Sequence, residues 1–293
     1  MSDGRKMDEW VYIAASTGVR YQRMAGYVCT IAGGKGGVGK TTTAINIAAA
    51  LEENGYDTVV VDADLGMANL GNMLGLEYET SIHEVLAGDE TVSAALNEAP
   101  MGMTVIPGEQ SLEAFAEADP AKLRKVINTL KNTFDVVLVD TGAGLSHETT
   151  VPLGLADGVL LVTTPDDVAV NDTIKTADLA GRVDGTVIGA LITRVNRDTY
   201  VQEIADKFDV PLLGVIPGDV EATKEEPLLE NASESDPADA YRQLAESLEA
   251  VFFEGAPSTD LDRVFDSQWF LDEEEEEADE EDEDGGVFGG IFG

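Results

Sequence analysis

Short runs of consecutive apolar residues alternate along the chain with segments in which apolar residues recur every three to four positions. The apolar runs are rich in Val, Ile and Leu, as in Val-Val-Leu-Val at 136–139. Continuous apolar runs of this length are typical of parallel strands that are covered on both faces. We therefore expect strands over 27–32, 58–62, 103–107, 135–140, 158–163, 187–193 and 212–217.

The segments between these runs have a helical period. We expect helices over 41–54, 121–132, 168–183, 201–208 and 237–253. Regular alternation of strand and helix predicts an α/β fold, with a doubly wound, mostly parallel sheet and helices on both faces. Such sheets bind ligands beyond the carboxyl ends of their strands. Residues that directly follow the expected strands are therefore the first candidates for function.

The same pattern divides the 293 residues into three parts. Residues 1–23 precede a second methionine, Met24, and form either an accessory segment or a mis-assigned start. Residues 24–254 hold all the expected strands and helices. Residues 255–293 contain an acid run, 272–284, in which twelve of thirteen residues are Asp or Glu. We expect most of this tail to be disordered.

Acidic residues outnumber basic ones by 57 to 18, giving a net charge of −39. This argues against DNA binding through a broad basic face. We expect a solvated acidic surface suited to a salt-rich cytoplasm, and hence a haloarchaeal source, with an acidic partner-binding face as the alternative. The single cysteine, Cys29, excludes a disulfide within the chain and a cluster held by several of its thiolates. With no long apolar run and no signal peptide, we predict a cytoplasmic protein.

A glycine-rich loop follows the first expected strand and precedes a helix. Its segment 34–41 fits the phosphate-loop pattern G-x-x-x-x-G-K-[ST]. In this pattern backbone N–H groups surround the phosphates, Lys40 reaches the β- and γ-phosphates, and the Thr41 hydroxyl binds Mg²⁺. The alternative is a glycine-rich turn with an incidental lysine. The expected nucleotide ligands here are Gly34, Lys35, Gly36, Gly37, Val38, Gly39, Lys40, Thr41 and Thr42.

The loop contains a second lysine, Lys35, so that it reads K-G-G-x-G-K-T. Over about residues 26–253 the chain resembles the deviant Walker A family of P-loop ATPases that includes MinD and ParA. The resemblance implies ATP as the ligand and an ATP-dependent homodimer in which Lys35 contacts the nucleotide of the partner subunit. The local alternative is that Lys35 neutralises phosphate charge within its own chain.

Carboxylates follow two of the expected strands. Asp62 and Asp64 end one, and Asp140 ends another. Near a phosphate loop, such carboxylates hold Mg²⁺ or orient the attacking water. The resemblance assigns the water to Asp64 and the Walker B role at Mg²⁺ to Asp140. It assigns Asp62 more weakly to the Mg²⁺ shell, and the alternative is that Asp62 caps the following helix.

Two further comparisons of motifs refine the resemblance. The pattern D-x-D-x-G-x-x-N-L over 62–70 looks like the MinD branch. Gly142 stands where MinD usually has proline, which is more similar to the flagellar-number regulators FlhG and FleN. The resemblance also implies that Arg194, Asn196 and Pro217 lie in the loops that bind adenine. Nothing independent of it distinguishes ATP from GTP. For His83 and His147 we expect surface or helix-start positions without metal.

The tail departs from MinD, whose basic C-terminal helix binds anionic lipid. This leaves little support for peripheral membrane association at the membrane or cell poles. We predict a slow ATPase that dimerises with ATP and Mg²⁺ and positions a cellular machine through an unidentified protein partner. The machine is the division apparatus or the motility and chemosensory apparatus. The alternatives are a metabolic P-loop synthase and a nucleotide-dependent scaffold without useful hydrolysis.

Overall fold

The centre of the fold is an eight-stranded sheet. The computed structural model describes residues 25–144 and 147–255. The strands follow the spatial order β3-β4-β2-β5-β1-β6-β7-β8, and all neighbouring strands are parallel except β3 and β4. The strands are β1 (Tyr27–Ala32), β2 (Thr58–Ala63), β3 (Asn97–Glu98), β4 (Thr104–Ile106), β5 (Val136–Thr141), β6 (Gly158–Thr163), β7 (Val187–Val195) and β8 (Leu212–Pro217).

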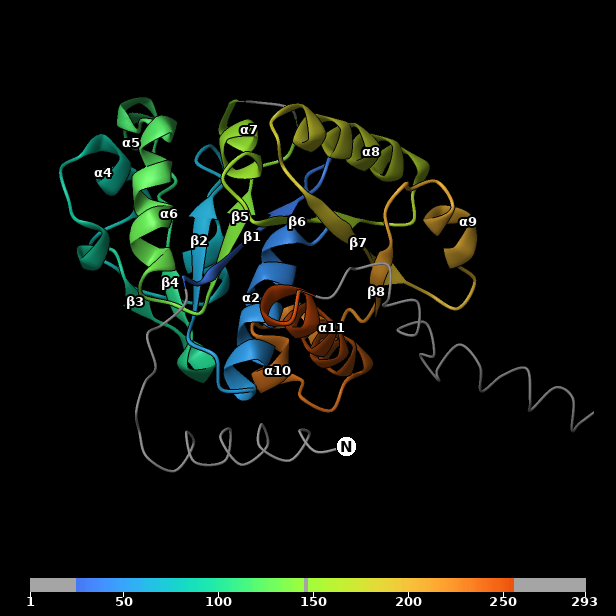
Figure 1. Cartoon of the computed structure of the whole chain (residues 1–293). Coiled ribbons are helices and arrows are strands. Elements are labelled where there is room, and N and C mark those ends of the chain that lie inside the picture. The colour runs from blue at the N-terminus through green and yellow to red at the C-terminus, as the bar shows by residue number, and fades with distance from the viewer. Residues whose placement is uncertain (1–24, 145–146, 256–293) are drawn as a thin grey trace, which may run out of the picture.

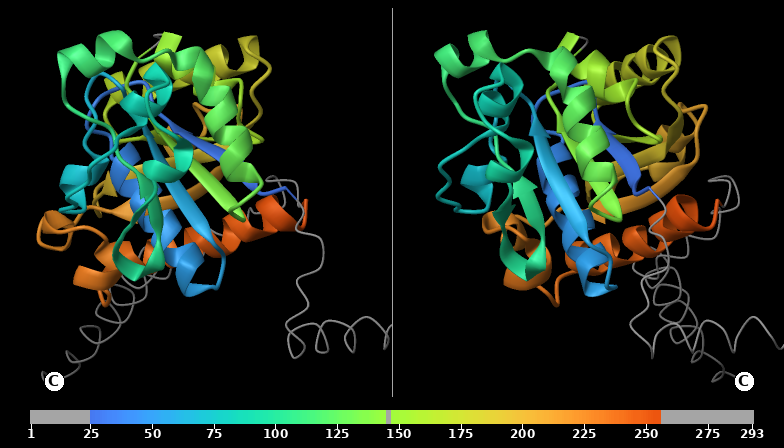
Figure 2. Two further views of the ribbon diagram at one scale, coloured as in Figure 1. Left: turned by 90° about the vertical axis from the view of Figure 1, so that its left-hand side faces the viewer. Right: turned by 60° about the vertical axis from the view of Figure 1, so that its left-hand side comes forward.

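Helices cover both faces of this sheet (Figures 1 and 2). The α-helices are α2 (Lys40–Glu53), α3 (Leu70–Met73), α4 (Ile82–Ala87), α5 (Leu112–Glu117), α6 (Leu123–Lys131), α7 (His147–Leu153), α8 (Asp167–Arg182), α9 (Val201–Ala205), α10 (Leu228–Asn231) and α11 (Asp236–Phe253). The 3₁₀ turns are η1 (Val92–Ala94), η2 (Pro100–Gly102), η3 (Pro120–Lys122) and η4 (Ala222–Lys224). The α/β, doubly wound fold class is confirmed.

Successive residues of each central strand enter different cores, because side chains alternate between the two faces of a sheet. In β2, Val60 packs in the core under α2 and α11. Its neighbours Val59 and Val61 pack in the core under α4 and α6. A third core lies between β6, β7 and the helices α8 and α9. Burial on both faces explains why these strands are apolar at almost every position.

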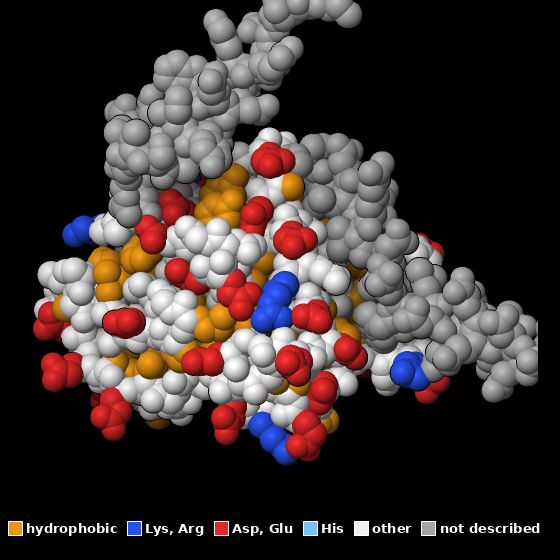
Figure 3. Space-filling view, turned by 90° about the horizontal axis from the view of Figure 1, so that it is seen from below, with side chains coloured by type: hydrophobic (Ala, Val, Ile, Leu, Met, Phe, Trp, Pro, Cys, Tyr) orange, Lys and Arg blue, Asp and Glu red, His pale blue; other side chains and the backbone are white. Residues whose placement is uncertain are grey.

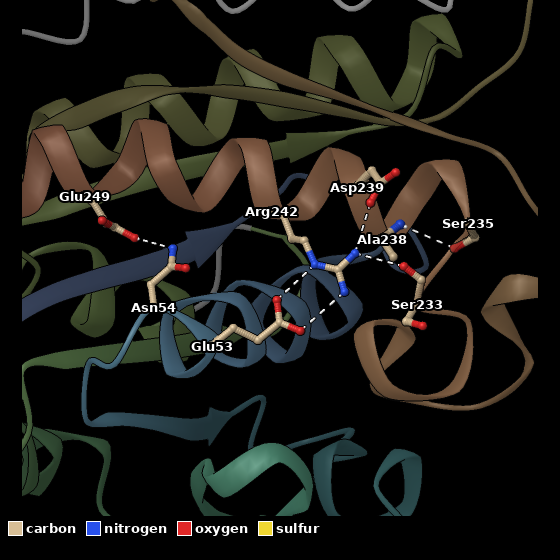
Figure 4. Close-up of polar contacts among 8 residues, drawn as sticks. All are labelled: Glu53, Asn54, Ser233, Ser235, Ala238, Asp239, Arg242 and Glu249. Carbon is tan, nitrogen blue, oxygen red and sulfur yellow. Dashed lines mark hydrogen bonds and ion pairs between the residues drawn. The ribbon is translucent and has the colours of Figure 1, made fainter.

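Helix α11 is fixed to α2, the helix that follows the phosphate loop. Arg242 Nε donates to Glu53 Oε2 at 2.9 Å, and its Nη1 donates to Asp239 Oδ1 at 3.0 Å (Figure 4). Deeper in the interface, the hydroxyls of Thr43 and Tyr241 lie 3.2 Å apart, both fully buried. Helix α11 therefore contacts α2 near both ends of α2.

The seven strands expected from the sequence are all present, with bounds within about two residues and three of them identical. All five expected helices are also present. The sequence analysis did not predict α3, α4, α5, α7, α10 or β3. The helices among them have only four to seven residues, which is too short for a helical period to show.

Acidic side chains are spread over the lower face of the molecule among few Lys and Arg (Figure 3). None of the helices in the described ranges is long and apolar enough to cross a membrane. The predictions for residues 1–23, for the acid run and for the rest of the tail beyond residue 255 lie outside the described residues.

Candidate functional site

The phosphate loop lies at the carboxyl end of β1, in the middle of the sheet (Figure 1). Gly39 caps α2 with φ 94°, a left-handed conformation that favours glycine. Gly34 packs against α8, where a Cβ on it would lie 2.1 Å from the carbonyl carbon of Asp172. The glycines at these two positions are therefore required by the shape of the loop, which presents the N-terminus of a 14-residue helix to an anion.

The two lysines of the loop point to different surroundings. Lys40 is only 7% exposed, and its Nζ donates to the carbonyl oxygen of Lys35 at 3.4 Å. Burial lowers the pKa of Lys40, while the carboxylates of Asp140 and Asp64 oppose that shift. The side chain of Lys35 is 47% exposed, and its Nζ lies 3.3 Å from Asp166 Oδ1 at the start of α8. Only Lys40 is enclosed with the acidic residues of the site.

Thr41 and Asp140 come together from α2 and the end of β5. Thr41 Oγ1 donates to Asp140 Oδ2 at 2.6 Å and lies 3.1 Å from Asn69 Oδ1. Burial raises the pKa of Asp140, and its neighbour Asp62 raises it further. Asp140 Oδ1 is buried and accepts no hydrogen bond from the described residues. A hydroxyl beside a buried carboxylate with an unused oxygen is a donor set that suits Mg²⁺.

Asp62 is buried at the end of β2, and backbone N–H groups occupy its carboxylate. Its Oδ2 accepts from Asn69 N at 3.0 Å and from Leu70 N at 3.1 Å. Its Oδ1 accepts from Asp64 N at 3.2 Å. Burial raises the pKa of Asp62, whereas these hydrogen bonds lower it. This geometry agrees with the capping alternative for Asp62, and its role in the Mg²⁺ shell stays a prediction.

Asp64 stands at the start of the loop between β2 and α3. Its Oδ1 accepts from Met67 N at 3.1 Å. Gly142, after β5, lies directly against it, since a Cβ on Gly142 would be 3.0 Å from that oxygen. The structure thus places Asp64 beside the residue that follows β5, and its role in orienting water stays a prediction.

Hydrogen bonds from His83 and Gln110 hold the loop that follows Asp64, and they were not predicted from the sequence. His83 is the second residue of α4 and is 1% exposed. Its Nε2 lies 2.9 Å from Leu65 O, and its Nδ1 accepts a hydrogen bond from Glu109 N at 3.1 Å. Gln110 Nε2 donates to Ala68 O at 2.6 Å. His83 is therefore at a helix start, as expected, but buried rather than on the surface. Its only sequence signal was a histidine within an apolar helical segment.

A buried polar cluster links the phosphate-loop helix to the segment before α10, and it too was missed. Asn46 Nδ2 donates to Glu226 Oε2 at 2.7 Å and to Thr42 O at 2.8 Å. Asn46 Oδ1 accepts from Leu228 N at 2.8 Å. Burial raises the pKa of Glu226 to about 7, although hydrogen bonds from Asn46 and Thr42 oppose the shift. These contacts span about 180 residues of sequence, so no local pattern could reveal them.

The expected base-binding residues lie on neighbouring loops. Arg194, the penultimate residue of β7, has a left-handed φ of 57° and is exposed. Asn196 Oδ1 accepts from the Thr199 hydroxyl at 3.0 Å. Pro217 ends β8 and pairs with Val195, and Gly218 N donates to Val195 O at 2.8 Å. The two loops are therefore adjacent, two and three strands away from β1, and contact with a base stays a prediction.

Comparison with known proteins agrees with this geometry. Residues 26–179 match the family model described as AAA domain. An uncharacterised ATP-binding protein of Methanocaldococcus jannaschii is 35% identical over 232 residues, covering 76% of this chain and 88% of the relative. The antiactivator FleN of Pseudomonas aeruginosa is 30% identical over 211 residues, covering 67% and 75%. The septum site-determining protein MinD of Pyrococcus horikoshii, solved with Mg-ADP, is 33% identical with a TM-score of 0.73, covering 78% and 98%.

These relatives include both the MinD and the FleN sides of the resemblance that the switch motifs indicated. The matching segments contain the phosphate loop and the strand ends that carry Asp62, Asp64 and Asp140. The chain belongs to the MinD/ParA family of deviant Walker A P-loop ATPases, in its MinD branch.

Proposed function

We propose that this chain is an ATP-hydrolysing switch that dimerises when ATP and Mg²⁺ are bound and so positions a cellular machine. The observation that carries the proposal is the different surroundings of the two loop lysines. Lys40 is buried with Asp140 and Asp64, whereas Lys35 is half exposed at the rim of the loop. A lysine held at the rim can reach a nucleotide in a second subunit, while Lys40 serves the nucleotide in its own.

Each residue of the site has a chemical task in this proposal. Lys40 and the loop N–H groups stabilise charge on the phosphates. Thr41 and Asp140 hold Mg²⁺, which neutralises phosphate charge when bound. Asp64 orients the attacking water, and the N–H of Met67 fixes one of its oxygens. Lys35 leaves Asp166 of its own chain when it contacts the partner nucleotide.

The machine and the partner follow from the relatives and remain part of the proposal. The relatives include a septum site-determining protein and a flagellum site-determining protein. Gly142, which replaces the usual MinD proline, favours the motility or chemosensory apparatus over division. We propose that an additional, unidentified protein partner recognises the ATP-bound dimer. Peripheral contact with an anionic membrane has weak support, because residues 256–293 contain one basic residue, Arg263, and fifteen acidic ones.

Light scattering at molar KCl tests the switch. Wild type and Asp64→Ala are each measured with ATP and with ADP, with phosphate release followed in parallel. We expect a dimer only with ATP, decaying in wild type as phosphate appears and persisting in Asp64→Ala. A monomer under every condition overturns the switch and favours the metabolic synthase.

Two lysine variants separate binding from dimerisation. Lys35→Ala is expected to keep binding a fluorescent ATP analogue as a monomer, whereas Lys40→Ala is expected to lose binding. A dimer formed by Lys35→Ala with ATP contradicts the role of Lys35 across the interface. A folded Lys40→Ala protein that still binds the analogue contradicts the assignment of the loop.

A further inference from the structure

Helix α6 and the turn before it carry a basic surface on a strongly acidic chain. Residues 120–134 include Lys122, Arg124, Lys125 and Lys131 but no Asp or Glu, although the chain has a net charge of −39. Leu123, Val126, Ile127 and Leu130 face the core. The intervening Arg124 and Lys125 are exposed and line a shallow hollow with the residues Ala121, Asn128, Thr129 and Asn132. We call this surface the α6 basic face.

The cations at the two ends of this segment are already occupied, but those in the middle are not. Lys122 donates to Ala87 O, and Lys131 Nζ lies 2.6 Å from Asp157 Oδ2. Within the described part of the chain, Arg124 and Lys125 have no ion-pair partner. By contrast, the exposed lysines Lys175, Lys207 and Lys224 each pair with a carboxylate. Two adjacent free cations form a site for an anionic segment.

The chain itself supplies a segment of opposite charge. Residues 272–284 carry twelve carboxylates and no cation. The face drawn in Figure 3 carries many carboxylates, and the chain as a whole has a net charge of −39, so both repel such a run. Charge complementarity therefore favours the α6 basic face over the rest of the molecule.

Helix α11 ends near the last residue of α6. Phe252 and Phe253 line one hollow together with Lys131, the last residue of α6. From Lys131 to Lys125 is six helical residues, about 9 Å along the axis. The 16 residues between 255 and 272 span at most about 60 Å when extended. A tether of this length raises the local concentration of the acid run at α6 to roughly the millimolar range.

We propose that the acidic segment 272–284 docks on the α6 basic face of its own chain. The docked carboxylates pair with Arg124 and Lys125 and screen these cations from other polyanions. The contact is made of exposed ion pairs, so it weakens as salt rises. It involves none of the residues assigned to nucleotide chemistry.

A spin label on the tail tests the contact in the full chain. Ala278 is the one neutral residue of the acid run, and Cys29, the native cysteine, is buried. The variant Ala278→Cys therefore accepts a nitroxide at one site without changing the charge. We expect the label to weaken the backbone amide signals of residues 121–132 at least about threefold more than those around Lys207 and Lys224. Raising KCl from about 0.1 M to about 1 M shrinks the Debye length from about 10 Å to about 3 Å and should restore these signals.

Matched variants decide the interpretation. In the labelled background, Arg124→Gln with Lys125→Gln should abolish the weakening, and so should changing Glu273–Glu277 to Gln. Lys207→Gln with Lys224→Gln removes two cations elsewhere and should leave it unchanged. Weakening that persists without Arg124 and Lys125, or that is uniform over the surface, overturns the proposal. Mixing nitroxide-labelled chains with separate isotope-labelled chains detects contact between copies, and weakening found in that mixture as strongly as in the single chain also overturns it.

Discussion

At the scale of single residues, the position of Asp64 depends on the absence of a side chain at Gly142. A Cβ at that position would lie 3.0 Å from Asp64 Oδ1, closer than ordinary van der Waals contact. We predict that Gly142→Ala displaces the Asp64 carboxylate and slows ATP hydrolysis about tenfold, equivalent to about 1.4 kcal/mol, while ATP binding changes little. Steady-state phosphate release and analogue binding measure the two effects.

Gly181→Ala is the matched control, because a Cβ on Gly181 meets nothing within 4 Å. Its hydrolysis rate should equal that of wild type. If Gly142→Ala hydrolyses ATP at the wild-type rate, then Gly142 does not set the position of Asp64 in the working enzyme.

A second residue-scale prediction concerns Glu226. Its pKa is about 7 in the folded protein and 4.5 ordinarily, so between these values the folded form keeps a proton that the unfolded form has lost. The free energy of unfolding therefore falls as pH rises through this window. We predict that Glu226→Gln removes roughly 1–3 kcal/mol of this fall between about pH 5 and pH 8. Urea unfolding of both proteins at constant KCl measures it, and parallel pH curves would refute the assignment.

At the scale of elements, the contact between α11 and α2 depends on a buried hydroxyl pair. Tyr241→Phe leaves the buried Thr43 hydroxyl without its partner on α11. We predict a loss of about 1–2 kcal/mol in the free energy of unfolding. Tyr200→Phe alters a tyrosine that is 75% exposed and should stay within about 0.5 kcal/mol of wild type.

The double variant Thr43→Val with Tyr241→Phe completes a thermodynamic cycle for this pair. Because both hydroxyls are then absent, the double variant should lose less free energy of unfolding than the two single variants lose together. Simple additivity would show that the two hydroxyls do not interact.

At the scale of the whole molecule, charge repulsion sets the response to salt. A net charge of −39 on 293 residues destabilises any compact state when it is unscreened. We predict that the unfolding temperature rises steeply with KCl up to about 1 M, where the Debye length is about 3 Å, and more slowly beyond. Thermal scans followed by circular dichroism test this. Sucrose at matched osmolality is the uncharged control, and an equal rise in sucrose would show that screening is not the cause.

Local patterns determined the core of this molecule. Burial on both faces makes β5 apolar over its first four residues, Val136 to Val139. The phosphate loop needs glycines and lysines in a fixed order. Both features can therefore be recognised from the sequence alone. The same rules placed Asp62, Asp64 and Asp140 at strand ends. Resemblance to relatives then supplied the family.

Tertiary structure decided what depends on residues that are distant in sequence. His83 braces the Asp64 loop only because α4 packs beside the end of β2, and Glu226 meets Asn46 across about 180 residues. Lys131, the last residue of α6, lies near Phe252 and Phe253 of α11 only because both helices end beside the start of β1. Such contacts arise when the sheet orders its strands in space, and a pattern read along the chain carries no information about that order.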